Sequence, residues 1–112
     1  MTGIADGAFS YIPNLKSVTI PDGVTYIGRY AFYNCSSLSF INIPENVTFI
    51  GVKAFYGTSL TSATFEKTST WGYHDDMTHE FYGEIDPAKL QNDREAAKLL
   101  AEKSYGSNWK RS

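Results

Sequence analysis

The chain has 112 residues, with ten Lys and Arg against twelve Asp and Glu, a formal net charge of -2 and 42% hydrophobic residues. This length fits one domain with one core, and the weakly acidic balance excludes the basic surface that binding to nucleic acid or to an anionic membrane would require. No apolar run approaches the ~20 residues of a membrane span, and residues 1–9 lack the basic and apolar regions of a secretory signal, so an exported protein would contain this sequence as a mature piece or a fragment.

The first half of the chain repeats one pattern at intervals of 23 positions. Equivalent positions are Ile4, Ile27 and Ile50; Ala8-Phe9, Ala31-Phe32 and Ala54-Phe55; Leu15, Leu38 and, after a one-residue deletion, Leu60; and Val18, Ile41 and Ala63. A fixed period of this length is typical of a solenoid, in which each coil packs its apolar side chains against the same side chains of the next. The sequence therefore predicts a mainly β solenoid over residues 1–66.

Within each coil, alternation of apolar and polar residues predicts a short strand. Val18 and Ile20 are expected to point inward. The outward positions of the three strands are Ser17 and Thr19, then Phe40 and Asn42, then Ser62, Thr64 and Glu66. A second extended piece is expected over residues 24–28, and a tight helical turn is expected to begin at Ala31.

Cys35, the only cysteine, has no partner for an intramolecular disulfide, so the fold must be stable through packing alone. By the repeat it occupies the same position as Ile12 and Thr58. We therefore expect a small buried side chain, not a nucleophile.

The pattern I-G-x-x-A-F-x-x-C-x-x-L-x-x-[VI]-x-I-P is present almost whole in residues 27–44. It resembles the BspA-like (Treponema pallidum-type) leucine-rich repeats of bacterial cell-surface proteins, and the resemblance covers residues 4–66. The later part of the chain is similar to the C-terminal end of such proteins in gut Firmicutes through Thr70-Trp71, Asp86-Pro87, Ala96-Ala97-Lys98-Leu99-Leu100 and Trp109-Lys110-Arg111-Ser112. The resemblance implies a non-enzymatic adhesion module, extracellular or at the cell surface, that binds a host or microbial protein.

Residues 67–112 are predicted to be a capping segment of strands plus one helix. A solenoid needs such an end because its last coil leaves strand edges and apolar columns open to water. Strands are expected over residues 68–73 and 80–85, with Trp71, Phe81 and Ile85 covering the last column.

Two patterns in this segment indicate the start of a helix. Asp86 precedes a proline, and Asn92 lies three residues before Glu95. The apolar residues expected on one face of the helix are Leu90, Ala97, Leu100 and Tyr105, with Gly106 ending the helix and Trp109 acting as an aromatic anchor.

Residues 74–79, HDDMTH, place two histidines and two carboxylates close together. These residue types ligate divalent metals, which leaves a metal-using enzyme as the least favoured alternative. The spacing is not that of a helical HExxH site, and no Gly-rich phosphate loop is present. We therefore expect a solvated polar loop, no metal, no cofactor and no catalytic residues.

The outward strand positions are the candidate ligand-binding residues: Ser17, Thr19, Phe40, Asn42, Ser62 and Thr64. Phe40 stands out, because an exposed aromatic residue among small polar neighbours is typical of a contact anchor. The alternatives are that a loop or a neighbouring chain covers Phe40, and that the whole chain is a structural cap or spacer of a longer solenoid. Only Met1 to Gly3 precede Ile4, so we also expect either a longer natural chain or self-association through this open coil.

Overall fold

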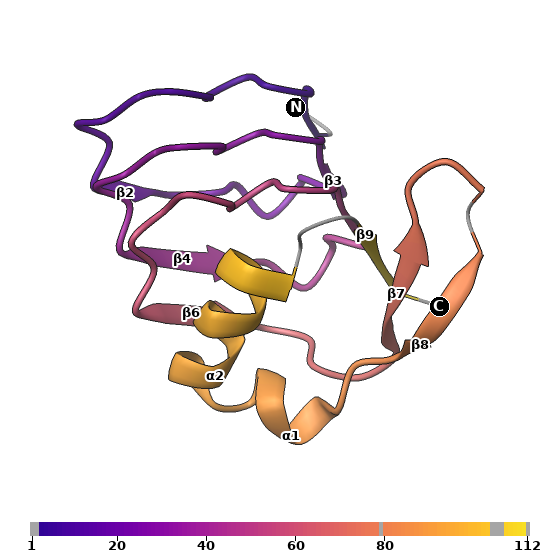
Figure 1. Cartoon of the computed structure of the whole chain (residues 1–112). Helices are drawn as coiled ribbons and strands as arrows, with labels where there is room; N and C mark the ends of the chain where they lie inside the picture. The colour runs from indigo at the N-terminus through magenta and orange to yellow at the C-terminus, as the bar shows by residue number, and fades with distance from the viewer. Residues whose placement is uncertain (1–2, 79, 104–106, 112) are drawn as a thin grey trace.

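The computed structural model of the chain describes residues 3–78, 80–103 and 107–111. The backbone of residues 3–66 winds in successive coils that lie one above another, with helices α1 and α2 and the hairpin β7–β8 beyond them (Figure 1). The strands are β1 (Gly3–Ile4), β2 (Ser17–Val18), β3 (Tyr26–Ile27), β4 (Phe40–Ile43), β5 (Phe49–Ile50), β6 (Ser62–Phe65), β7 (Trp71–Asp75), β8 (Phe81–Glu84) and β9 (Ser107–Arg111). The helices are α1 (Pro87–Leu90) and α2 (Asp93–Lys98), and α2 continues into the π-helical turn η1 (Leu99–Lys103).

Two sheets run along the stack of coils, and both follow the repeat. One has the order β2-β4-β6 and is parallel, with Val18 opposite Ile41 and Ile41 opposite Ala63. The other has the order β1-β3-β5-β9-β7-β8, and its first three strands are parallel, with Ile27 opposite Ile50. Equivalent residues of successive coils are therefore neighbours in the sheets, as the 23-residue period predicts.

The coils approach one another closely at Gly28 and Gly51, which hold the same position in consecutive coils. The Gly28 N–H donates to the Ile4 carbonyl and the Gly51 N–H to the Ile27 carbonyl, both at 2.8 Å. A Cβ on Gly28 would lie 2.6 Å from the backbone nitrogen of Asp6. Glycine is required here because the backbone of the previous coil occupies the space of a side chain.

The segment after each of these glycines is a run of consecutive turns, so the turn expected at Ala31 is present, but the described segment forms no regular helix. The Phe9 N–H donates to the Ala31 carbonyl, and the Phe32 N–H to the Ala54 carbonyl, both at 2.8 Å. Alternate N–H groups thus bond with the neighbouring coil, while those between them close turns within the segment, as from Tyr33 to the Tyr30 carbonyl at 3.1 Å. Left-handed backbone recurs at two positions of this segment: Gly7, Tyr30 and Lys53 at one, and Tyr11, Asn34 and Gly57 at the other.

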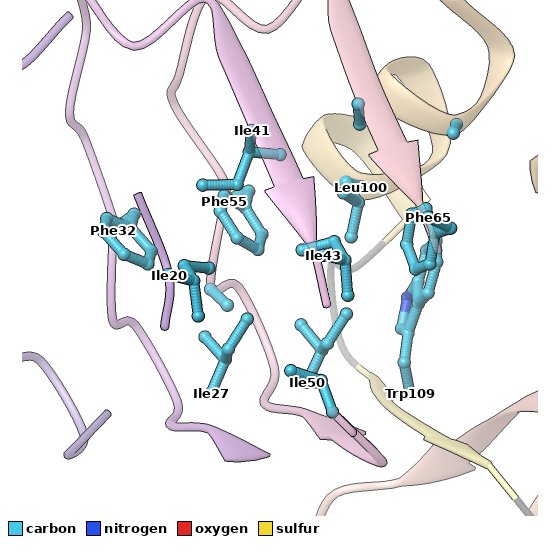
Figure 2. Packing of buried hydrophobic residues seen from close by; sticks show 14 of the residues in the cluster. Ile20, Ile27, Phe32, Ile41, Ile43, Ile50, Phe55, Phe65, Leu100 and Trp109 are labelled. Carbon is cyan, nitrogen blue, oxygen red and sulfur yellow. The ribbon is translucent and has the colours of Figure 1, made fainter. Parts of the chain in front are cut away.

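The core consists of rows of equivalent side chains that run through the coils. Figure 2 shows Ile27 beside Ile50 and Phe32 beside Phe55, with Phe65 over Trp109 at the end of the stack. The row of phenylalanines that begins at Phe9 is stacked almost parallel, with ring centroids 5.4 Å apart at Phe9–Phe32 and 5.2 Å at Phe32–Phe55. Burial of these rows supplies most of the driving force for folding.

Cys35 is fully buried, as predicted, and its thiol donates to the Phe9 carbonyl at 2.9 Å. It contacts the previous coil and so belongs to the same core. Ile20 is buried and Val18 half-buried, so both point inward as expected, although strand β2 ends at Val18 and does not include Ile20.

The C-terminal segment contains two helices and a final strand where one helix was expected. Asp86 caps α1 by accepting the N–H of Ala88, and Asn92 caps α2 by accepting the N–H groups of Arg94 and Glu95, which confirms both predicted starts. The predicted apolar face is divided: Leu90 belongs to α1, Ala97 to α2 and Leu100 to η1, and all three are buried. Tyr105 and Gly106 lie outside the described residues.

Strand β9 was not expected, because Trp109 was predicted only to be an anchor. It pairs antiparallel with β5 on one side and with β7 on the other, placing Trp109 opposite both Ile50 and Tyr73. Trp109 and Trp71 pack around Phe65, with ring centroids 5.8 Å and 5.7 Å from it. Trp71 and Ile85 are buried as predicted, whereas the prediction for Phe81 is wrong, since its side chain is 56% exposed.

Candidate functional site

The outward face of the sheet β2-β4-β6 carries the predicted ligand-binding residues, and we call it the strand face. Phe40 lies at its centre, opposite Ser17 of one neighbouring strand and Ser62 of the other. The Phe40 side chain is 43% exposed, while Ile41 next to it in β4 is fully buried. The alternation of β4 therefore leaves a single large apolar side chain between two small hydroxyl residues.

Two of the polar residues on the strand face already have partners within the chain. The Asn42 amide donates to a carboxylate oxygen of Glu66 at 2.6 Å, and the Thr64 hydroxyl donates to a carboxylate oxygen of Asp93 at 3.1 Å. Thr19 is exposed and lies just beyond the end of β2. A ligand could bind Phe40 without breaking a hydrogen bond, whereas a ligand oxygen at Asn42 or Thr64 would meet a side chain that already donates to a carboxylate.

Glu66 and Asp93 therefore belong to this surface, although sequence reasoning omitted Asp93 and did not connect Glu66 with Asn42. The outward position of Glu66 was expected from the alternation of the third coil, and only its hydrogen bond with Asn42 was not. Asp93 could not be found from the sequence, because it reaches the strand face only through the placement of α2 beside β6.

The carboxylates of the loop 74–79 are used within the structure. Asp75 accepts the Tyr82 hydroxyl at 2.6 Å and the N–H groups of Met77 and Thr78, each at 2.8 Å. These hydrogen bonds, the one from Tyr82 first, hold the pKa of the Asp75 carboxyl well below its usual range. The same bond raises the pKa of Tyr82, because it favours the protonated hydroxyl.

Asp76 links the hairpin to the coils. It accepts the Arg29 Nε–H at 2.5 Å and the Asn108 amide at 3.1 Å. The hydrogen bond to Asp76 raises the pKa of Arg29, and the backbone N–H of Arg29 donates to the Asp6 carboxylate at 2.8 Å. The fully buried Asn108 in turn accepts the Val52 N–H at 2.8 Å.

The remaining members of residues 74–79, where a metal site was the least favoured alternative, give no ligand set among the residues that the structure describes. The His74 ring lies against Phe81 at 5.3 Å between centroids, and His79 is outside the described residues. No group of three or more His, Cys, Asp or Glu side chains suited to a metal lies within residues 3–78, 80–103 and 107–111.

A second aromatic surface lies on the turn side of the coils. Tyr11 and Tyr30 meet Tyr33 edge to face, at 5.5 and 5.4 Å between centroids, and Tyr56 stacks on Tyr33 at 5.9 Å. Such pairs contribute about 0.5–1.5 kcal/mol each. They offset the cost of left-handed backbone at Tyr11 and Tyr30, of order 1–2 kcal/mol per residue, so this surface has a structural explanation.

The first coil exposes part of its apolar row, since Phe9 and Ile12 are 38% and 37% exposed. Self-association through this coil stays a prediction. In the described part of the chain, no helix combines the length and the apolar character that crossing a bilayer requires.

Comparison with known proteins gives one result that bears on identity. The family model described as "BspA type Leucine rich repeat region (6 copies)" matches residues 2–78, more than half of the 112 residues. Searches of curated proteins and of solved structures find no match. The matched range includes every coil of the stack and the first strand of the hairpin.

Proposed function

We propose a protein-binding function for this chain, which belongs to the BspA type leucine-rich repeat family. Proteins of this family generally bind other proteins and occur at surfaces or in secreted form. In this proposal the chain is a non-enzymatic adhesion module of an extracellular or cell-surface protein, and its ligand is a host extracellular or microbial surface protein.

The observation that supports a site is the exposure of Phe40 at the centre of the strand face. Aromatic residues carry much of the binding energy at interfaces, above all when small neighbours let the partner exclude water around them. Ser17 and Ser62 on either side are small enough for such contact. Thr19, Asn42 and Thr64 would form the polar rim of this site.

The test is capture of the purified chain on a panel of immobilised vertebrate matrix proteins and bacterial surface fractions. Wild type is compared with Phe40→Ser, and with Tyr26→Ser as a matched control. Tyr26 is equally exposed, at 43%, and lies in β3 of the other sheet. Loss of an exposed anchor is expected to weaken binding by about 2 kcal/mol, or roughly thirtyfold.

The result distinguishes the strand face from other surfaces. Equal loss in both variants would indicate nonspecific adhesion by exposed aromatics and would contradict the proposal. Loss in the Tyr26→Ser protein alone would move the site to the other sheet.

A second function, as the structural end of a longer solenoid, is favoured by the position of residues 67–112. Strand β9 occupies the edge of β5 where the next coil would continue the sheet, and it runs antiparallel, which ends the parallel series. Helix α2 lies against β6, and Ala96, Ala97 and Leu100 are buried in the same core cluster as Phe65 of that strand. We therefore propose residues 67–112 as a capping segment and residues 1–66 as the repeat part.

The cap is tested by truncation after residue 66. The free energy of unfolding should fall sharply and the protein should self-associate, because β5, β6 and Phe65 would lose their cover. A truncated chain that stays monomeric and as stable as the full chain would contradict the capping role.

A further inference from the structure

An open groove separates the last coil from helix α2. It has a volume of about 780 Å³, within the range of ligand sites. One wall is the turn that leads into β6, with Ser59 and Thr61, and the other is the α2 face that carries Arg94 and Lys98. Leu60 and Ala101, both half-buried, supply apolar surface between the walls.

The helix wall carries two cationic side chains. Arg94 and Lys98 are four positions apart, so they lie on the same side of α2, and both side chains are exposed. Neither forms an ion pair with any other side chain that the structure describes. A chain with a net charge of -2 thus presents two exposed cations at one groove.

The orientation of this wall is fixed from both sides of the helix. Ala96 and Ala97 are buried against the core, and Asp93 is hydrogen-bonded to Thr64 of β6. The helix passes directly into the π-helical turn η1, a rare geometry that occurs frequently at functional sites. The cations are therefore held at the groove by packing, and the site needs no rearrangement of the backbone to form.

The coil wall differs from the helix wall, because its hydroxyl groups accept hydrogen bonds from a ligand where the helix wall would donate them. The Ser59 hydroxyl donates to the Ser36 carbonyl at 2.6 Å, and the Thr61 hydroxyl to the Ser39 carbonyl at 3.3 Å. The N–H groups of Ser59 and Thr61 also donate to carbonyls of the previous coil, at 3.0 Å each. Because these donors are used, Ser59 and Thr61 offer oxygen lone pairs to a ligand.

We propose that this groove binds an acidic peptide segment of a partner protein, with Arg94 and Lys98 binding its carboxylates. A peptide has carboxylate acceptors for the helix wall, N–H donors for Ser59 and Thr61, and apolar atoms for Leu60. A small inorganic oxyanion would bind Arg94 and Lys98 but would provide no N–H donor for the hydroxyl oxygens of the coil wall. This inference goes beyond the proposed function, because the groove is a different surface from the strand face.

The experiment measures fluorescence anisotropy of a labelled peptide of sequence GEELEEG, with GQQLQQG as the uncharged control peptide. The proteins are wild type, the double variant Arg94→Gln with Lys98→Gln, and the charge-matched control Lys67→Gln with Lys89→Gln. Circular dichroism checks that each variant is folded. We expect a Kd about tenfold weaker in the groove variant and unchanged in the control, with wild-type binding that weakens as salt rises.

A further variant and a further probe define the site. Thr61→Val removes a hydroxyl acceptor while keeping the shape, and should weaken the peptide severalfold. Inorganic phosphate and an oligosaccharide of glucuronic acid serve as competitors, and neither should displace the peptide at equal concentration.

The proposal is overturned by equal affinity of the groove variant and wild type, by equal binding of GQQLQQG, or by no binding up to millimolar peptide. Displacement by phosphate or by the acidic oligosaccharide would also overturn it, in favour of that ligand. Phe40→Ser should bind the peptide as wild type does, so failure of the strand-face proposal and failure of this one are distinguishable.

Discussion

The continuous phenylalanine row makes a quantitative prediction about stability. Phe32 is fully buried and stacked on both sides, by Phe9 at 5.4 Å and Phe55 at 5.2 Å. Phe32→Ala should therefore lower the free energy of unfolding by about 4 kcal/mol, through lost burial and an unfilled cavity inside the row. Phe9 is 38% exposed and stacks on one side only, so Phe9→Ala should cost about 1–2 kcal/mol.

Urea denaturation followed by fluorescence of the buried Trp71 and Trp109 measures both changes. At a slope of about 2 kcal/mol per molar urea, Phe32→Ala should lower the midpoint by about 2 M, and Phe9→Ala by about 0.5–1 M. Equal costs for the two variants would refute the reasoning, since they would show that stacking between coils does not determine the stability of this row.

Three further predictions concern contacts between segments. Gly51→Ala would place a Cβ against the backbone of Arg29, so the thermal midpoint should fall by about 10 °C; an unchanged midpoint would show that the coils are not in close contact there. In a double-mutant cycle on the free energy of unfolding, Asp76→Ala and Arg29→Ala should show a coupling energy of about 1 kcal/mol, since both side chains of this ion pair are about one third exposed. Strictly additive effects would show that the ion pair does not stabilise the fold. The hydrogen bonds to Asp75 lower its pKa, so the stability that the ionised carboxylate contributes is present above the usual carboxyl range and is lost as the pH falls through the folded pKa. In an NMR titration, the Asp75 carboxyl should have a lowered midpoint, and Tyr82→Phe should raise that midpoint. An equal midpoint in both proteins would contradict this prediction.

The coils could be predicted from the sequence because residues at equivalent positions of successive coils contact each other. Ile27 faces Ile50 and Phe32 stacks on Phe55, so the contacts impose the same residue types at a fixed period. The detail of the turn could not be predicted in the same way. The pattern at Ala31-Phe32 shows burial, but not whether the backbone bonds within itself or with the next coil, and here alternate N–H groups do each.

The end of the chain was harder to predict because its structure depends on distant partners. Strand β9 forms between β5 and β7, and nothing in residues 107–111 except Trp109 marks it as a strand. The expected helix is divided because Asn92 caps a second helix. Likewise, Phe40 could be chosen from alternation alone, whereas Asp93 beside Thr64 and the groove beside α2 follow from tertiary packing.

The measurement that tests protein binding by the strand face most directly is photo-crosslinking. A benzoylphenylalanine replaces Phe40 in one protein and Tyr26 in another, and each is irradiated with a protein captured from the panel. We predict a covalent adduct from position 40 and none from position 26. An adduct from position 26 alone, or from neither position while capture persists, would contradict a ligand site on the strand face.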